Sequence, residues 1–222
     1  MANEEGLMNS ETQGTIVETY LSRAPEKNSA AVSLLVIAVI FLFSMVYWGN
    51  SFGLSGDLII DRDSVFQSHQ YWRLFTGMLI HSDVNHFLSN ALGLFLFGYL
   101  LYGYFGPQIY PFGVCILGTI VNLISIATYP PGSRLLGASG MVYLMAAFWL
   151  TLFVTAERRF SIFQRLLRSA GFGLVMLVSS SFDPSISYRT HYIGFVAGVI
   201  FGIVYFFVAR DRIRAAEVVV YE

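Results

Sequence analysis

The sequence predicts an all-α, polytopic membrane protein, a bundle of six transmembrane helices with a long first loop outside the membrane. Of its 222 residues, 55% are hydrophobic and only 12% are charged, whereas about 25% are charged in a typical soluble domain. The charges also cluster, which leaves apolar runs near the ~20 residues that a membrane-spanning helix needs. Inside a bilayer, each such run must satisfy its own backbone hydrogen bonds, so each is expected to be a helix.

Six apolar stretches divide residues 30–209. The first carries no charge and ends in Tyr47 and Trp48, as is typical of an interfacial aromatic belt. The fifth is the weakest, because it is short and contains Gly171 and Gly173. The expected spans are about 30–49, 84–105, 108–127, 135–156, 166–182 and 188–209.

The loop between the first two spans, residues 50–83, mixes charged with apolar residues. A loop of this length in a compact protein is unusual and often functional. We expect it to lie partly in the outer membrane interface, with Trp72 as an anchor and the Arg73 side chain snorkelling toward water.

The two ends of the chain are expected to be short tails rather than domains. Residues 1–29 are polar and mildly acidic and lack the basic start and small-residue end of a signal peptide. Within them, Ile16, Val17, Tyr20 and Leu21 could form one face of a short interfacial helix. Residues 210–222 form the C-terminal tail.

The basic residues indicate the orientation, because cytoplasmic loops carry an excess of Lys and Arg. With six spans both termini lie on one side. Placing that side in the cytoplasm puts nine basic residues inside and four outside, namely Arg62, Arg73, Arg134 and Arg189. Both tails are therefore predicted to be cytosolic.

Composition excludes little else. With 13 basic and 14 acidic residues, the chain has no strong charge that would indicate nucleic-acid binding. The single cysteine, Cys115, lies in an apolar run, so a disulfide within the chain is impossible. We expect no cofactor and no metal.

The orientation brings three polar residues to one level. His86, Ser139 and His191 all lie near the outer ends of their spans. Asn90 follows His86 by four residues and Tyr143 follows Ser139 by four, so each pair shares a helix face. Polar side chains at membrane depth are costly and usually functional. The alternative for His86 and Asn90 is an interhelical hydrogen bond, worth about 0.6 kcal/mol on average.

Glycines suggest how the fourth and sixth spans could approach each other closely. The sixth span carries Gly194, Gly198 and Gly202 in one stripe with His191, and small residues of this kind let membrane helices approach closely. Gly140 could be the matching flat spot on the fourth span. Read alone, the segment from Gly137 to Gly140 is equally a packing site. With its partners, it favours a contact between Ser139 Oγ and His191.

A serine needs a base to take its proton, and an unperturbed imidazole titrates near ~6.5. Because Asp and Glu are absent from the spans, the residues favour a Ser139–His191 dyad, with the His191 ring oriented by packing, for example by stacking on Tyr143. His86, Asn90 and the backbone N–H of Ser139 could donate to an oxyanion.

In order and spacing, these motifs resemble the rhomboid intramembrane serine proteases from about residue 30 to 209. The resemblance rests on the Trp72-Arg73 pair, on His81, His86 and Asn90, on the G-x-S-G motif with Tyr143, and on His191 with its glycines. In full, the matching residues are Trp72, Arg73, His81, His86, Asn90, Gly137, Ser139, Gly140, Tyr143, His191, Gly194 and Gly198.

The resemblance implies a serine endopeptidase that cleaves transmembrane segments of other proteins near the outer face, in the plasma (inner) membrane. It implies Ser139 as nucleophile, His191 as base, an oxyanion hole of His86, Asn90 and the Ser139 N–H, and a lateral gate at the fifth helix and the loop after it. We expect His81 to support the structure by hydrogen bonding.

Two departures and two alternatives accompany this interpretation. Thr190 stands where the family often has alanine, which could alter packing but not chemistry, and we expect only six spans. The first alternative is an inactive rhomboid-like protein that binds client helices. The second is a haem or metal held by His86 and His191.

Overall fold

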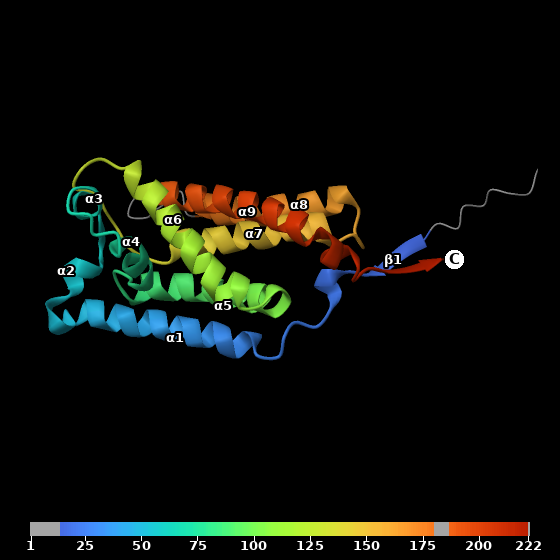
Figure 1. The fold of residues 1–222 in the computed structure, drawn as a ribbon, viewed down its shortest axis with the longest axis horizontal. Coiled ribbons are helices and arrows are strands. Elements are labelled where there is room, and N and C mark those ends of the chain that lie inside the picture. Colours follow the sequence, from blue (N-terminus) through green and yellow to red (C-terminus); the bar gives the residue numbers. More distant parts are fainter. Residues whose placement is uncertain (1–13, 180–186, 222) are drawn as a thin grey trace, which may run out of the picture.

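The computed structural model describes residues 14–179 and 187–221, and its long helices lie side by side in an elongated bundle (Figure 1). These helices are α1 (Ser29–Trp48), α5 (Val84–Phe105), α6 (Val114–Ala127), α7 (Ser139–Ala156), α8 (Ile162–Ser179) and α9 (Tyr188–Arg214). A short π-helix, η4 (Gln108–Gly113), joins α5 to α6. The predicted fold class, an all-α polytopic bundle, is confirmed.

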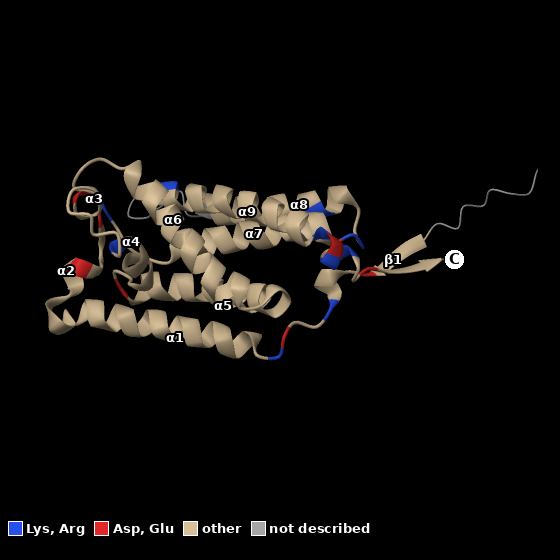
Figure 2. Ribbon diagram, in the orientation of Figure 1, with Lys and Arg blue, Asp and Glu red and all other residues tan. Residues whose placement is uncertain are grey.

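Among the described residues, five segments are long and apolar enough to cross a membrane: α1, α5, Gln108–Ala127, α7 and α9. Helix α8 is not one of them, and it carries Arg165 and Arg168 in its first two turns. Figure 2 shows that charged residues gather at the two ends of the bundle, whereas its middle is almost free of them. The chain is an integral membrane protein.

Three helices differ from the expected spans at their ends by four residues or more. Helix α9 runs to Arg214, five residues beyond the expected 209, and takes in the start of the expected C-terminal tail. Helix α7 begins at Ser139 rather than at 135, because Arg134 and Leu135 form the short strand β3 (Arg134–Leu135). Helix α8 begins at Ile162, four residues before the expected 166, and positions 180–182 of that predicted span lie outside the described residues. The loop expected to form part of a lateral gate also falls mainly on residues outside the described part of the chain.

Helix α7 is the centre of the bundle. It contacts α5, α6, α8 and α9, and its longest interface is with α9. Leu144, Met145, Phe148 and Leu152 are fully buried along it. A helix that is apolar all round belongs in the core of its bundle, and the position of α7 agrees with its sequence.

The first loop folds into short elements at one end of the bundle (Figure 1). They are η2 (Ser51–Gly53), α2 (Ser55–Leu58), β2 (Ile60–Asp61), α3 (Arg62–Phe66), α4 (Arg73–Thr76) and η3 (Gly77–Leu79). Strand β2 pairs antiparallel with β3, which ties this loop to the segment that precedes α7.

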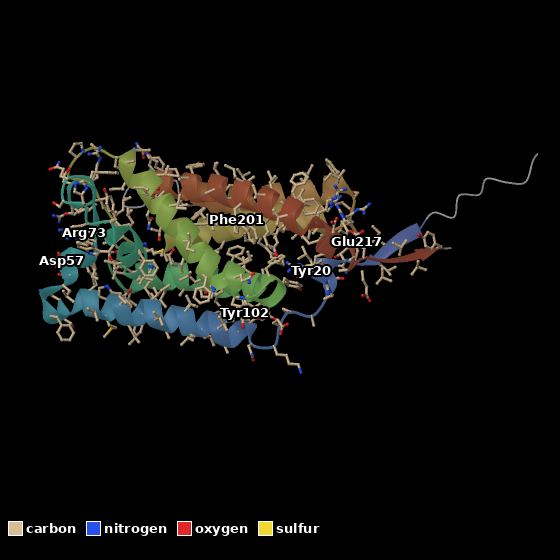
Figure 3. All side chains as sticks on the ribbon, viewed as in Figure 1. Tyr20, Asp57, Arg73, Tyr102, Phe201 and Glu217 are labelled. Carbon is tan, nitrogen blue, oxygen red and sulfur yellow. The ribbon has the colours of Figure 1, made fainter. Side chains whose placement is uncertain are left out.

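The expectation that Arg73 snorkels is wrong. Only 5% of the residue is exposed, and its guanidinium donates to the Gly56 and Ile59 carbonyls and to Asp57, with a 2.8 Å ion pair to the latter (Figure 3). A planar fork with five donors can satisfy several loop acceptors at once. Arg73 therefore holds the loop together from inside, while Trp72 is 55% exposed on its surface.

The tails also differ from expectation. Ile16 and Val17 belong to a strand, β1 (Gly14–Glu18), and Tyr20 and Leu21 to a short 3-10 turn, η1 (Tyr20–Ser22), so the interfacial helix is wrong. Strand β1 pairs antiparallel with β4 (Val218–Tyr221). Both strands lie at the end of the bundle opposite the first loop (Figure 1), which means that the chain traverses the bundle an even number of times, with α8 as one traverse.

Candidate active site

Ser139 is the first residue of α7 and lies beside a cavity of about 630 Å³. The cavity is polar on the side of the first turn of α5, where it is lined by Ser82, Asp83 and His86. The cavity is large enough to hold water and has polar groups that could bind it. The full lining is Ser82, Asp83, Asn85, His86, Ser89, Arg134, Leu135, Leu136, Ser139 and Ser187.

Gly137 brings the His86 ring against the backbone just before Ser139. Its φ is +109°, a conformation that favours glycine, and a Cβ at this position would lie 2.9 Å from His86 Nε2. Two separate constraints, backbone and space, therefore require glycine here.

The α7–α9 interface is built on glycine. A Cβ on Gly194 would overlap the carbonyl oxygen of Gly140, and one on Gly198 would overlap that of Leu144. Farther along, a Cβ on Gly202 would lie 2.7 Å from Thr151 Cβ. The two backbones are thus in direct contact over three turns, as small-residue stripes permit in membranes. The close approach expected from the glycine spacing is confirmed.

His191 lies in this interface and is 4% exposed. Its ring stacks on Tyr143 with centroids 4.2 Å apart and an interplanar angle of 10°. The Tyr143 hydroxyl donates to the Met176 carbonyl of α8 at 2.8 Å. One tyrosine therefore orients the His191 ring and links it to α8.

Neither ring nitrogen of His191 has a hydrogen-bond partner among the described residues. The expected hydrogen bond with Ser139 is therefore not formed in this structure, and no carboxylate of the described residues orients the ring. Catalytic hydrogen bonds are often long without substrate and tighten only when it binds.

His86 and Asn90 lie on α5, one turn apart. The Asn90 amide donates to the His86 carbonyl at 3.0 Å, within its own helix, and Asn90 is buried. The His86 ring is half-buried at the cavity wall. The structure thus brings His86 to the cavity with Ser139, whereas Asn90 lies one turn deeper in α5.

His81 has a supporting position. Its Nε2 accepts from the Ala138 N–H at 3.3 Å, and its Nδ1 contacts the Ser44 hydroxyl of α1 at 3.3 Å. The Trp48 indole donates to the His81 carbonyl at 2.7 Å. His81 lies in the loop before α5, where burial, and to a lesser degree His86, lowers its pKa to about 3. It therefore stays neutral and fixes the turn that carries Ser139.

Three polar residues near the site were not singled out from the sequence, although signals for them exist. Asp83 accepts from the His86 N–H as the N-cap of α5, which an acidic residue before an apolar run predicts. Ser82 contacts the His86 ring. Ser187 links Thr190 to Tyr129 through two contacts of 2.6 Å, which gives Thr190 a polar role as well as a packing one.

Trp72 and Arg73 do not line the cavity with Ser139. Helix α4, which carries Arg73, packs on α6. The pair belongs to the first loop, which contacts the site through its last residues, since Ser82 and Asp83 line the cavity.

Two relatives resemble this chain. "RHOMBOID-like protein 1" of Arabidopsis thaliana is 26% identical over 153 residues, which cover 66% of this chain and 37% of that protein. "Putative rhomboid protease YdcA" of Bacillus subtilis (strain 168) is 27% identical over 166 residues, which cover 74% of this chain and 82% of that protein. This chain therefore spans little more than a third of the plant relative.

The family comparison agrees with the relatives. The Rhomboid domain family matches residues 68–207, which include His86, Ser139 and His191. The family includes serine proteases and acts on membrane proteins within the bilayer. With this match over more than half of its length, the chain belongs to the rhomboid family.

Proposed function

We propose that this rhomboid-family chain is an intramembrane serine endopeptidase, which cleaves transmembrane segments of other membrane proteins with a Ser139–His191 dyad. The observation that carries the proposal is the α7–α9 interface. Glycines 140 and 194 bring the two backbones into contact at the level of Ser139, and Tyr143, one turn below Ser139, stacks on His191.

The roles follow from the chemistry of the groups. Ser139 Oγ attacks the substrate carbonyl while a ring nitrogen of His191 takes its proton. The His191 ring nitrogens have no hydrogen-bond partner among the described residues, which is consistent with a base that is free to take this proton. The developing oxyanion would receive hydrogen bonds from the Ser139 N–H, His86 and Asn90, and removal of one such donor typically costs about 10²–10³ in rate.

The placement in the membrane is part of the proposal. The paired tails lie at one end of the bundle, where Figure 2 shows basic residues. The basic residues Arg158, Arg159, Arg165 and Arg168 follow the end of α7 that is opposite Ser139, in the connection to α8 and in the first two turns of α8. An excess of basic residues marks the cytoplasmic side. Ser139 would then open to the outer face of the plasma (inner) membrane, and the partners would be transmembrane substrates in the surrounding lipid.

The test is cleavage of a reporter transmembrane substrate in proteoliposomes by wild type and by Ser139→Ala. We expect wild type to cleave and Ser139→Ala to be inactive. Ser187→Ala is a matched control, because Ser187 lines the same cavity but has no proposed part in the chemistry. Cleavage retained in Ser139→Ala would refute the nucleophile assignment.

A fluorophosphonate probe separates the protease from an inactive, client-binding rhomboid-like protein. The probe reports on an activated serine and needs no knowledge of the natural substrate. We expect labelling of wild type, and none of Ser139→Ala or His191→Asn. Equal signal from all three proteins would favour the client-binding alternative.

A further inference from the structure

Three side chains at the start of α5 form a hydrogen-bonded chain that ends at the candidate oxyanion donor. The Ser82 hydroxyl donates to Asp83 Oδ2 at 2.7 Å, and Ser82 Oγ lies 3.1 Å from His86 Nδ1. Asp83 Oδ1 accepts from the His86 backbone N–H at 2.9 Å. The carboxylate is thus held on the helix while its second oxygen faces Ser82.

The directions of these hydrogen bonds follow from a count of protons. A serine hydroxyl has one proton to donate and two lone pairs to accept with, and an ionised carboxylate can only accept. The Ser82 proton is therefore committed to Asp83. The contact between Ser82 and His86 then requires that Nδ1 carry a proton and donate it to Ser82 Oγ.

Asp83 is ionised under ordinary conditions. The His86 N–H and the Ser82 hydroxyl hold the pKa of its carboxyl below the usual range. The residue is exposed on the cavity wall, and it can act only as an acceptor at neutral pH.

We propose that Ser82 and Asp83 are positioning residues that fix the tautomer of His86 with the proton on Nδ1. A neutral imidazole has one donor nitrogen and one acceptor nitrogen, and the partner of one decides the state of the other. Nε2, at the Gly137 side of the ring, then has a lone pair whenever His86 is neutral. Only the imidazolium can donate from Nε2.

This proposal rests on the proposed function for its consequence in catalysis. An oxyanion hole that uses His86 requires the imidazolium, with Asp83 as its counter-ion through Ser82. The base, His191, must by contrast be neutral. The two histidines therefore have opposite requirements, which gives a bell-shaped dependence of rate on pH.

Other charged or titratable groups also act on the His86 ring. His81 packs edge-on against it with centroids 5.0 Å apart, and burial keeps His81 neutral. Arg134 of β3 lines the same cavity, and His191 of α9 is close enough to interact with His86 electrostatically. None of these three groups favours the imidazolium form of His86, whereas the carboxylate of Asp83 does.

The test reads the tautomer directly, by ¹⁵N NMR of the full chain with labelled histidine in detergent micelles. The chain has four histidines, so the spectrum is simple, and the His86 signals are those lost in His86→Gln. At a pH where His86 is neutral, we expect a protonated Nδ1 and an unprotonated Nε2 in wild type. A neutral wild-type ring protonated at Nε2 would overturn the proposal.

Asp83→Asn is the decisive variant, because asparagine caps helices as well as aspartate does. Its amide can donate to Ser82 Oγ, which frees the Ser82 proton for Nδ1, so we expect the tautomer to switch to a protonated Nε2. Ser82→Ala should give a mixture of both tautomers, and it serves as the second variant if Asp83→Asn fails to fold. Ser89→Ala, on the same wall but hydrogen-bonded to the His86 carbonyl and not to its ring, should leave the wild-type tautomer unchanged. An unchanged tautomer in both test variants would also overturn the proposal.

Turnover adds a separate readout. Wild type should lose activity on the alkaline side as His86 becomes neutral, and Asp83→Asn should retain it there because its neutral ring donates from Nε2. If the nitrogen signals behave as expected but neither protein cleaves any substrate, the proposed function fails and the tautomer assignment stands.

Discussion

Helices α8 and α9 both pack against α7, but α9 does so with its backbone and α8 mainly with side chains. Helix α9 touches α7 with its backbone, at Gly194 against Gly140 and at Gly198 against Leu144. Helix α8 touches α7 mainly through side chains, such as the Tyr143 hydroxyl on the Met176 carbonyl and the Ser169 hydroxyl on the Leu150 carbonyl. A rotamer change cannot relieve a contact between two backbones, whereas it can relieve a contact made by a side chain.

The difference separates a fixed element from an adjustable one. The α7–α9 interface carries both members of the candidate dyad, and any change in the separation of these helices would move His191 relative to Ser139. Helix α8 exposes large apolar residues, including Leu174 and Val175, and it could shift without parting α7 from α9. Tyr143 contacts both helices, α9 through the His191 ring and α8 through the Met176 carbonyl.

The largest effect is expected from Gly194→Ala. The added methyl group would overlap the Gly140 carbonyl, a backbone atom that cannot turn aside. We expect a loss of about 1–3 kcal/mol in unfolding free energy from overpacking, and a loss of about 10²-fold in cleavage rate from a dyad displaced by about 1 Å.

Gly171→Ala is the matched control on α8, because a Cβ there would meet nothing within 4 Å. Denaturation in mixed micelles and cleavage of the reporter substrate measure the two effects. Equal behaviour of the two variants would contradict the distinction between α8 and α9.

The next effect concerns Tyr143. Tyr143→Ala removes the ring that stacks on His191, and we expect a fall in cleavage of about 10²-fold, as for other displaced catalytic groups. Tyr143→Phe keeps the ring and removes the hydrogen bond to Met176, a net loss of about 1 kcal/mol or less. Cleavage by Tyr143→Phe should remain within a few-fold of wild type. If Tyr143→Phe is as inactive as Tyr143→Ala, the link to α8, and not the stack, controls the site.

The sequence was informative where periodicity decides the outcome. Gly194 and Gly198 are four residues apart, so they must share a face, and their packing against α7 could be predicted. A helical pattern fixes faces but not rotamers, which is why the hydrogen bond between Ser139 and His191 was expected but is not formed. Whether Arg73 turns inward depends on carbonyls from distant parts of its loop, for which no local pattern exists.

The pairing of the tails could not be predicted for a similar reason. Strands β1 and β4 are separated by the whole membrane domain, and register between distant strands has no signal in a single sequence. The β-branched run at Val218–Val220 does favour a strand. Its partner strand was not predicted, because the spacing of Ile16 and Tyr20 also fits one face of a helix.

A third prediction concerns the start of α7, where His81 Nε2 accepts a hydrogen bond from the Ala138 N–H. Its pKa is lowered to about 3 in the folded protein, so the unfolded chain binds more protons between that value and the ordinary 6.5. Stability should therefore fall as pH decreases through this window, by about 2 kcal/mol at pH 5 if His81 acted alone. Denaturation of wild type and His81→Gln at pH 7 and pH 5 measures this, and the variant should lose less stability between the two. An equal loss in both proteins would show that other groups cause the acid sensitivity.

The smallest effect is expected at the other end of α7, where an ion pair lies in the connection between α7 and α8. Glu157 accepts from Arg159 at 2.7 Å and from the Thr19 hydroxyl at 3.0 Å. Burial raises the pKa of its carboxyl, but the hydrogen bonds from Arg159 and Thr19 outweigh this, and the net pKa is lowered from 4.5. A lowered acid pKa stabilises the fold above about pH 4.5, and this stabilisation is lost as pH falls through the folded value.

Glu157→Gln should therefore cost about 1–2 kcal/mol at pH 7, since Arg159 is partly exposed to solvent, and almost nothing in strong acid. Denaturation curves from pH 7 to pH 3 measure the difference. Because this contact anchors the α7–α8 connection and not the α7–α9 interface, cleavage by Glu157→Gln should stay near the wild-type rate at a temperature where both proteins are folded. A large loss of cleavage in a stably folded Glu157→Gln would mean that the position of α8 is transmitted to the dyad, and that α8 and α9 are coupled more closely than their contacts with α7 indicate.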